Sequence, residues 1–184
     1  DNITDKRLAS GAVVTIAWPT ITHLSSEPIP LILMTDRDRM TDDIDGEGET
    51  FDLGRQRTKT FGSRGMTVCE SSPGRDLTDI RYTTEGHEAP PVGGILGLYN
   101  RGDRRRWYWS CRDCGCGFEP SFDLLEWRDT DNIQEASANV SMRCPHCGGL
   151  VEERHRKEFN ANGQWLADGL YIRDGEMNGV ARPT

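Results

Sequence analysis

The chain has 184 residues, a length that suits one ordinary domain or two small ones. It carries 22 Lys and Arg against 30 Asp and Glu, and this net charge of −8 argues against a wholly basic nucleic-acid-binding protein while allowing a local basic patch. No apolar run approaches the roughly 20 residues that span a bilayer, so no membrane partner is expected. The start has no signal-peptide pattern, and because it is not Met we expect a piece of a longer protein.

The first half of the chain predicts an α/β domain. Two apolar runs, at residues 11–18 and 30–34, lack alternation and predict buried strands of a parallel sheet covered on both faces. An acidic loop follows at 42–49, then a helix over 51–61 and a third strand at 65–69. This order of elements predicts part of a parallel α/β sheet.

Polar side chains follow two of these predicted strands. Asp36 and Asp38 come directly after one strand, at the edge where α/β sheets bind ligands, and carboxylates there can hold magnesium or orient a nucleophilic water. Ser71 and Ser72 follow the next strand, where hydroxyls can sense a phosphate. The alternatives are a solvated loop and an ordinary turn. A calcium loop within 42–54 is rejected because its last position lacks the bidentate Glu.

The second half of the chain predicts a separate small β unit. Residues 84–98 are rich in Gly and Pro and predict a linker or irregular loop. Short strands are expected beyond it, one of them at 107–109, together with a short helix at 152–160 and a frayed tail at 174–184.

The cysteines indicate a metal site. Two Cys-x-x-Cys pairs, Cys111 with Cys114 and Cys144 with Cys147, are separated by 29 residues, which is typical of a structural zinc site with four thiolate ligands. Cys116 competes with Cys114 for one position. Reduced free thiols or a redox pair remain alternatives. Four protein ligands leave no open position, so no catalysis is expected there.

A basic run adjoins the first cysteine pair. It contains Arg101, Arg104, Arg105 and Arg106, followed by three aromatic residues at 107–109. Such a run can neutralise phosphates and stack on bases. The alternative is a solvated face in which the Arg side chains pair with nearby acids and bind nothing.

Taken together, these motifs resemble the lambda-like terminase large subunit family (GpA), the motor that packages viral DNA. Residues 31–40, Leu-Ile-Leu-Met-Thr-Asp-Arg-Asp-Arg-Met, resemble its Walker B stretch, which is usually an apolar run followed by Asp-Glu-Val-Asp-Arg. Residues 48–61 resemble the helix after Walker B, and residues 70–73 resemble the coupling motif. Residues 99–114 and 143–149 resemble the two parts of the zinc-binding stretch, and residues 163–165 resemble the Gly-x-Trp ending.

The resemblance implies that residues 1–98 are the C-terminal part of a P-loop NTPase-like ATPase domain and that 99–170 form a zinc-ribbon-like domain, with 171–184 leading towards a nuclease domain. The full-length protein would then be an ATPase and endonuclease that uses ATP and Mg²⁺ to translocate double-stranded DNA into a procapsid in the host cytoplasm. The small terminase subunit, the portal and further copies of the chain would be its partners.

The sequence departs from this family pattern at two places. Thr35 stands where the magnesium-holding Asp is expected, and Asp36 replaces the catalytic Glu. No Gly-x-x-x-x-Gly-Lys-Ser/Thr phosphate loop occurs, so the chain by itself is expected to be inactive. The alternative function is therefore a non-catalytic zinc-ribbon module that binds nucleic acid or serves in assembly.

Overall fold

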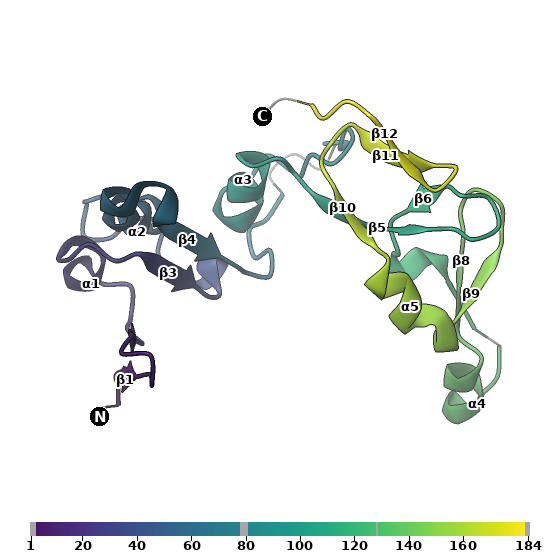
Figure 1. Ribbon diagram of the computed structural model, residues 1–184, viewed down its shortest axis with the longest axis horizontal. Helices are drawn as coiled ribbons and strands as arrows, with labels where there is room; N and C mark the ends of the chain where they lie inside the picture. The colour runs from purple at the N-terminus through teal and green to yellow at the C-terminus, as the bar shows by residue number, and fades with distance from the viewer. Residues whose placement is uncertain (1–2, 78–80, 128, 183–184) are drawn as a thin grey trace. The chain divides into compact units, whose positions relative to one another are not determined.

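The computed structural model describes residues 3–77, 81–127 and 129–182. The chain divides into two compact units, drawn in Figure 1. Unit 1 contains residues 1–78 and 91–98, and unit 2 contains 79–90 and 99–184. In the described part of the chain, no helix combines the length and the apolar character that crossing a membrane requires.

Unit 1 is built around one parallel strand pair. Strand β3 (Leu31–Met34) runs beside β4 (Met66–Cys69), with Leu31 opposite Met66 and Met34 opposite Cys69. Parallel neighbours need a long crossover connection. Here it consists of η1 (Arg37–Arg39), the acidic loop, α2 (Thr50–Thr58) and η2 (Lys59–Arg64). The predicted strands at 30–34 and 65–69 and the helix between them are thereby confirmed.

Within the described part of the chain, only one face of this strand pair is covered. Helices α1 (Ile21–Ser25) and α2 pack with it around a small core of Leu24, Met34 and Ile44. The side chains on the other face are between 40% and 66% exposed: Leu31, Leu33, Met66 and Val68. The prediction of a sheet covered on both faces is wrong for the described residues, because both helices of this core lie on the same face.

Two further predictions need correction, the second of them only in part. Instead of a buried strand over 11–18, only β2 (Val13–Thr15) forms, and it pairs antiparallel with β1 (Asp5–Arg7) while Val13 and Val14 stay exposed. The irregular segment predicted at 84–98 contains the start of helix α3 (Gly94–Asn100). A side chain distant in the sequence supports this helix, because the Asp38 carboxylate accepts the Ile95 N–H at its first turn.

Unit 2 consists of small antiparallel sheets. In sheet order these are β10 (Gln164–Leu166), β5 (Arg106–Ser110) and β6 (Gly117–Phe118); β7 (Leu125–Glu126), β8 (Ser141–Arg143) and β9 (Leu150–Glu152); and β11 (Leu170–Arg173) with β12 (Glu176–Gly179). Short helical segments connect them: η3 (Phe122–Leu124), α4 (Ile133–Ala138), η4 (Glu153–His155) and α5 (Arg156–Ala161). Figure 1 shows α5 beside β10. The predicted strand at 107–109 and helix at 152–160 are confirmed.

Where a frayed tail was predicted at 174–184, the chain forms the turn and the second strand of a hairpin. Strands β11 and β12 pair with Arg173 opposite Glu176, so Asp174 and Gly175 form a two-residue turn. Both turn residues have positive φ, 55° and 77°, as the Asp-Gly turn of a tight hairpin requires. Residues 183–184 lie outside the described part of the chain.

Aromatic packing forms the core of unit 2. The Trp109 ring contacts Phe118 and Phe159 with centroids 6.2 and 5.4 Å apart, and the Trp109 indole N–H donates to Asn160 Oδ1 at 2.9 Å. Buried Cys111 and Cys144 belong to the same cluster. The sulfur-bearing turns are therefore continuous with the apolar core.

Candidate functional site

The first candidate site lies where β3 and β4 end. The two strands stop together, and Glu70 N–H donates to the Met34 carbonyl at 2.9 Å, while Arg37 N–H donates to the Glu70 carbonyl at 3.1 Å. Between these bonds the backbone turns at Asp36, which has a left-handed conformation with φ 54°. This conformation is uncommon for a residue other than Gly and marks a constrained position. The Asp36 side chain is exposed, and among the described residues its carboxylate accepts no hydrogen bond.

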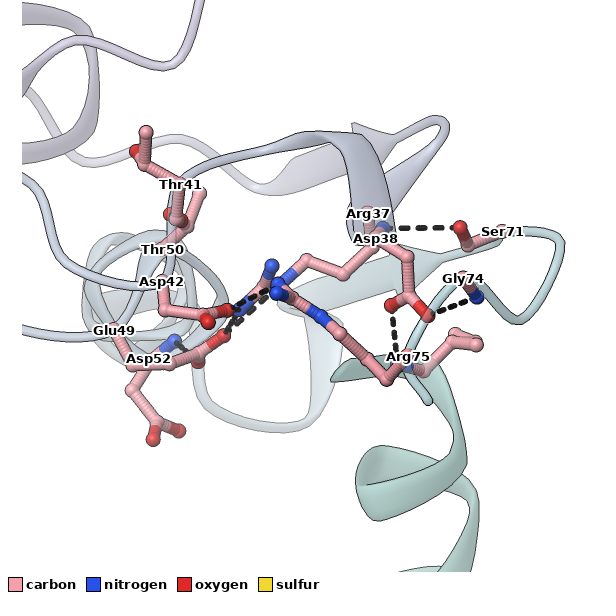
Figure 2. Close-up of polar contacts among 11 residues, drawn as sticks. Arg37, Asp38, Thr41, Asp42, Glu49, Thr50, Asp52, Ser71, Gly74 and Arg75 are labelled. Carbon is pink, nitrogen blue, oxygen red and sulfur yellow. Dashed lines mark hydrogen bonds and ion pairs between the residues drawn. The ribbon is translucent and has the colours of Figure 1, made fainter. Parts of the chain in front are cut away.

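Asp38 instead connects three segments of unit 1. Its carboxylate accepts the Gly74 N–H at 2.9 Å and the Ile95 N–H at 2.7 Å, and its backbone N–H donates to Ser71 Oγ at 3.0 Å (Figure 2). The structure thus brings together the predicted residues Asp38 and Ser71, which are 33 positions apart in the sequence. Ser72 contributes its carbonyl, which accepts the Ser71 hydroxyl, while its own side chain is exposed.

The surroundings of Asp38 favour its charged form. Partial burial opposes ionisation, but the two backbone N–H donors and the positive charges of Arg75 and Arg37 outweigh it, so the pKa of Asp38 lies below its ordinary value. Because it accepts hydrogen bonds from two backbone amides, the Asp38 carboxylate holds the segments around Gly74 and Ile95 in position. Of the two predicted aspartates, Asp36 is the one whose carboxylate is exposed and accepts no hydrogen bond from a described residue.

Arg37, which sequence reasoning missed, anchors this edge of the sheet. It is only 1% exposed, and its guanidinium binds the carboxylates of Glu49 and Asp42 (Figure 2). The Glu49 carboxylate also accepts the Asp52 N–H at 3.1 Å and so caps α2. Burial lowers the pKa of Arg37, but these two carboxylates outweigh it and raise the pKa, which keeps the guanidinium charged. The sequence signal for this buried cation is an Arg within a charged run directly after a buried strand.

The second candidate site is a cluster of four sulfurs in unit 2. The Sγ atoms of Cys111 and Cys147 are 3.7 Å apart, and those of Cys114 and Cys144 are 3.9 Å apart. All four lie within 4.8 Å of one another. Tetrahedral zinc with Zn–S bonds of about 2.3 Å requires neighbouring sulfurs about 3.8 Å apart, so the donor set and its spacing fit that ion.

Two matching turns present these sulfurs. In the first, Gly115 N–H donates to the Cys111 carbonyl and Cys111 N–H to the Cys116 carbonyl, both at 2.9 Å. In the second, Gly148 and Gly149 make the same bonds with Cys144, at 2.9 and 2.8 Å. Gly115 and Gly148 have φ of 68° and 78°, so each turn needs a residue that accepts left-handed backbone.

The turns also account for Cys116. Cys116 occupies the position in the first turn that Gly149 occupies in the second. At this position the backbone carbonyl accepts the N–H of the turn's first cysteine. Its thiol is not a member of the four-sulfur cluster found among the described residues. His146, which lies between the two cysteines of the second turn, contacts the Gly117 carbonyl through Nε2 at 3.0 Å.

The surroundings shift the pKa values of Cys111 and Cys144 in opposite directions. Burial raises the pKa of Cys144 to about 12. At Cys111 burial is outweighed by hydrogen bonds from the Cys114 and Asp113 N–H groups, so its pKa is lowered. A bound cation favours all thiolates, since it supplies the positive charge that these packed sulfurs lack.

The predicted basic run is largely paired with carboxylates. Arg104 binds the buried Asp168 at 3.1 Å, Arg105 binds Asp103 at 2.6 Å, and Arg106 binds Glu119 at 3.2 Å. The exposed fraction of the side chain is 15% for Arg104 and 56% for Arg105. The structure therefore leaves the four arginines with unequal access to a phosphate.

Unit 2 also holds a buried polar network that the sequence did not reveal. His87 Nδ1 lies 2.9 Å from the Arg104 carbonyl and Nε2 lies 2.9 Å from the Tyr108 hydroxyl. The backbone N–H of His87 donates to Asp168 Oδ1, 81 residues later in the sequence. Because a carbonyl can only accept, Nδ1 carries the proton and Nε2 accepts from Tyr108 when the ring is neutral. This network fixes the segment before the basic run.

Comparison with known families decides the identity of the chain. A family model described as the phage terminase large subunit gpA, ATPase domain, matches residues 1–165, which is most of the sequence. The chain belongs to this family. No curated protein and no solved structure matches it.

The match confirms the resemblance seen in the sequence and covers both sites of this gpA-family chain. Asp36, Asp38 and Ser71 lie within the matched residues, and so do all four clustered cysteines. Membership supports ATPase activity in full-length terminases and a role in a packaging motor.

Proposed function

We propose that residues 1–98 of this gpA-family chain form the rear part of the motor ATPase and that residues 99–170 form its zinc-ribbon-like unit. The full-length terminase hydrolyses ATP to move double-stranded DNA into a procapsid in the host cytoplasm, and a separate nuclease domain cuts the DNA. It works as a homo-oligomer with the small terminase subunit and the portal. Family membership supports the motor role, and the Asp38–Ser71 hydrogen bond at the common end of β3 and β4 supports the assignment of the site.

In this proposal the residues at the strand ends have separate roles. Asp36 orients the attacking water, because its carboxylate is exposed at the strand edge. Asp38 holds the loop that follows β4 in position through Gly74. Ser71 and Ser72 couple phosphate state to movement, since displacing Ser71 pulls on the Asp38 backbone. ATP with Mg²⁺ supplies the transferred phosphoryl group.

ATP hydrolysis by the full-length terminase tests these roles. We expect Asp36→Asn to lower kcat by about 10²–10⁴-fold, the usual contribution of a positioned general base. Asp45→Asn is the matched control, because Asp45 is also exposed and also left-handed, with φ 53°. Ser71→Ala should retain hydrolysis while lowering the DNA length packaged per ATP. Equal activity of Asp36→Asn and Asp45→Asn would refute the role of Asp36.

One observation favours a second function. Thr35 stands at the position of the magnesium-holding Asp, which suits a non-catalytic module that binds nucleic acid or serves in assembly. A full-length protein that hydrolyses no ATP above background, yet packages DNA beside an active copy, would establish this alternative. The 184-residue chain alone is expected to bind no ATP, because the sequence contains no phosphate loop.

The four-sulfur cluster holds structural zinc in this proposal. Cys111, Cys114, Cys144 and Cys147 supply four thiolates at the spacing that tetrahedral zinc requires, and no ligand position is left for a substrate. Metal analysis of the purified chain should find one zinc per chain. A metal-free chain that keeps its fold would contradict the assignment.

The basic run contributes weak contacts with the DNA backbone. Arg105 is the most open of the paired arginines in the run, whereas Arg104 is committed to Asp168. With one or two phosphates neutralised, log affinity should fall with log salt with a slope of about −1 to −2. Arg101→Ala with Arg105→Ala should flatten this slope, and Arg154→Ala with Arg156→Ala should leave it unchanged. A slope that the first pair does not alter would exclude DNA contact by the run.

A further inference from the structure

Unit 2 exposes an aromatic pair that its core does not use. Phe122, in η3, and Trp127, directly after β7, are 74% and 54% exposed. Their rings nonetheless contact each other, with centroids 6.3 Å apart and planes at 46°. The core aromatics Trp109 and Phe118 are only 5% and 2% exposed. Two large aromatic side chains that meet at the surface form an apolar patch of the kind that marks interaction sites.

The pair flanks an edge strand. In the sheet order β7-β8-β9, strand β7 pairs only with β8, through Leu125 opposite Met142 and Glu126 opposite Ser141. Among the described strands none covers the other side of β7. A shallow hollow of about 380 Å³ lies at this edge and is lined by Leu125, Glu126 and Trp127. An open edge beside apolar side chains can accept an additional strand from another polypeptide.

The charge around the aromatic pair is strongly negative. Residues 119–135 carry six acidic side chains and one basic side chain. Glu119 and Glu126 are balanced by Arg106 and Arg143. Three more acids lie before and after β7 and form no ion pair with a described residue: Asp123, Asp129 and Asp131. A surface of this charge repels a nucleic-acid backbone and attracts Lys and Arg side chains.

We propose that this aromatic edge, defined by Phe122, Leu125 and Trp127, binds an extended segment of a partner protein that is apolar in the middle and basic at both ends. The segment adds its backbone to β7 and packs its apolar side chains on the two rings. Its basic ends meet the acids on either side of the strand. This surface is a protein-docking site in addition to the ATPase, metal and DNA functions proposed above.

Synthetic peptides test the proposal with the metal-loaded full chain. The probe is fluorescein-labelled KKVTVTVKK, which has an alternating β-branched centre and basic ends. KKSTSTSKK keeps the charge without the apolar residues, and EEVTVTVEE keeps the apolar residues with the opposite charge. Fluorescence anisotropy should give the probe at least ten-fold tighter binding than either control, and added salt should weaken it. Equal binding of the probe and KKSTSTSKK would overturn the proposal.

Variants locate the binding. Phe122→Ser with Trp127→Ser should weaken probe binding at least ten-fold, whereas Trp18→Ser should leave it unchanged, because Trp18 is 84% exposed and belongs to unit 1. Metal content and circular dichroism verify the fold of each variant. If the double variant loses its fold, the wild-type chain decides by NMR. The probe should shift the Trp127 indole resonance and not that of Trp18, and an unshifted Trp127 resonance at saturation would refute the site.

Discussion

The two units reach stability by different means although they share one thinly apolar sequence. Unit 1 keeps Leu24, Met34 and Ile44 buried on one face of a single strand pair, and charged groups complete its structure, with Arg37 almost fully enclosed. Unit 2 joins its aromatic core directly to a cluster of four sulfurs. With the zinc proposed above, unit 2 would depend on one chemical event, metal binding, whereas unit 1 depends on many small contacts.

Replacing one of the four clustered cysteines should produce the largest difference in stability between the two units. Cys144→Ser takes away a sulfur that belongs to both the cluster and the core. Structural zinc contributes about 10–16 kcal/mol of apparent binding energy in small domains, so unit 2 should unfold. Unit 1, which contains none of the four ligands, should keep its NMR amide spectrum. Chelation of the wild-type metal should have the same effect.

The control for this prediction is Cys116→Ser. Cys116 contributes a backbone carbonyl to the first turn and lies outside the sulfur cluster, so this variant should bind one zinc and stay folded. Zinc lost from Cys116→Ser but kept by Cys114→Ser would reverse the choice of ligand.

Within unit 1, the two faces of β3 should respond unequally. Met34→Ala removes a buried side chain and should lower the free energy of unfolding by about 2–5 kcal/mol. Leu33, its neighbour on the other face, is 66% exposed, and Leu33→Ala should change that free energy by no more than about 0.5 kcal/mol. Native-state hydrogen exchange at the Glu70 amide, which donates to the Met34 carbonyl, reports both effects. Similar losses in both variants would mean that the outer face is covered in solution.

The charged contacts of unit 1 should rank next. Arg37→Met keeps the length of the side chain but leaves Glu49 without its cation, while Asp42 keeps its ion pair with Arg75. Because both carboxylates retain some solvent, we expect a loss of about 2–3 kcal/mol from the stability of unit 1. Arg39→Met is the matched control, since Arg39 lies two residues along in the same η1 turn and is exposed. The Glu70 amide again serves as the probe, and equal exchange rates in the two variants would show that the Arg37 contacts contribute nothing measurable.

Sequence reasoning succeeded where the signal was local. Cysteine spacing identified the four clustered sulfurs, and one short apolar run identified β3. The sequence placed Asp38 and Ser71 after separate strands without predicting their contact, which arises because the two parallel strands end at the same edge. The Asp174-Gly175 turn was equally readable as a hairpin signal, and the frayed-tail interpretation overlooked it.

The missed features depend on tertiary contacts. Helix α3 starts in a segment rich in Gly and Pro, and its first turn is held by Asp38, 57 residues earlier. His87 and Asp168 meet across 81 residues. The apolar run at 11–18 looked buried because composition alone does not say whether another element will pack on it. Pairings of this kind are set by the assembled fold and leave no periodic pattern in the sequence.

The smallest expected effect is the titration of Asp38, which tests whether unit 1 depends on its loop contacts. The pKa of Asp38 is lowered in the folded chain, so the favourable contacts are fully present above the unfolded pKa of about 3.9 and are lost as the pH falls through the lower folded pKa. Unit 1 should therefore lose a small part of its stability below about pH 4. The Gly74 and Ile95 amides donate directly to this carboxylate, so their NMR shifts should titrate with a midpoint below that unfolded pKa. Asp38→Asn should abolish this common titration, because the amide side chain does not ionise in that range. A midpoint at or above the ordinary value would show that the two N–H donors do not favour the charged form, and that Asp38 does not hold the loops after β4 and before α3 in place.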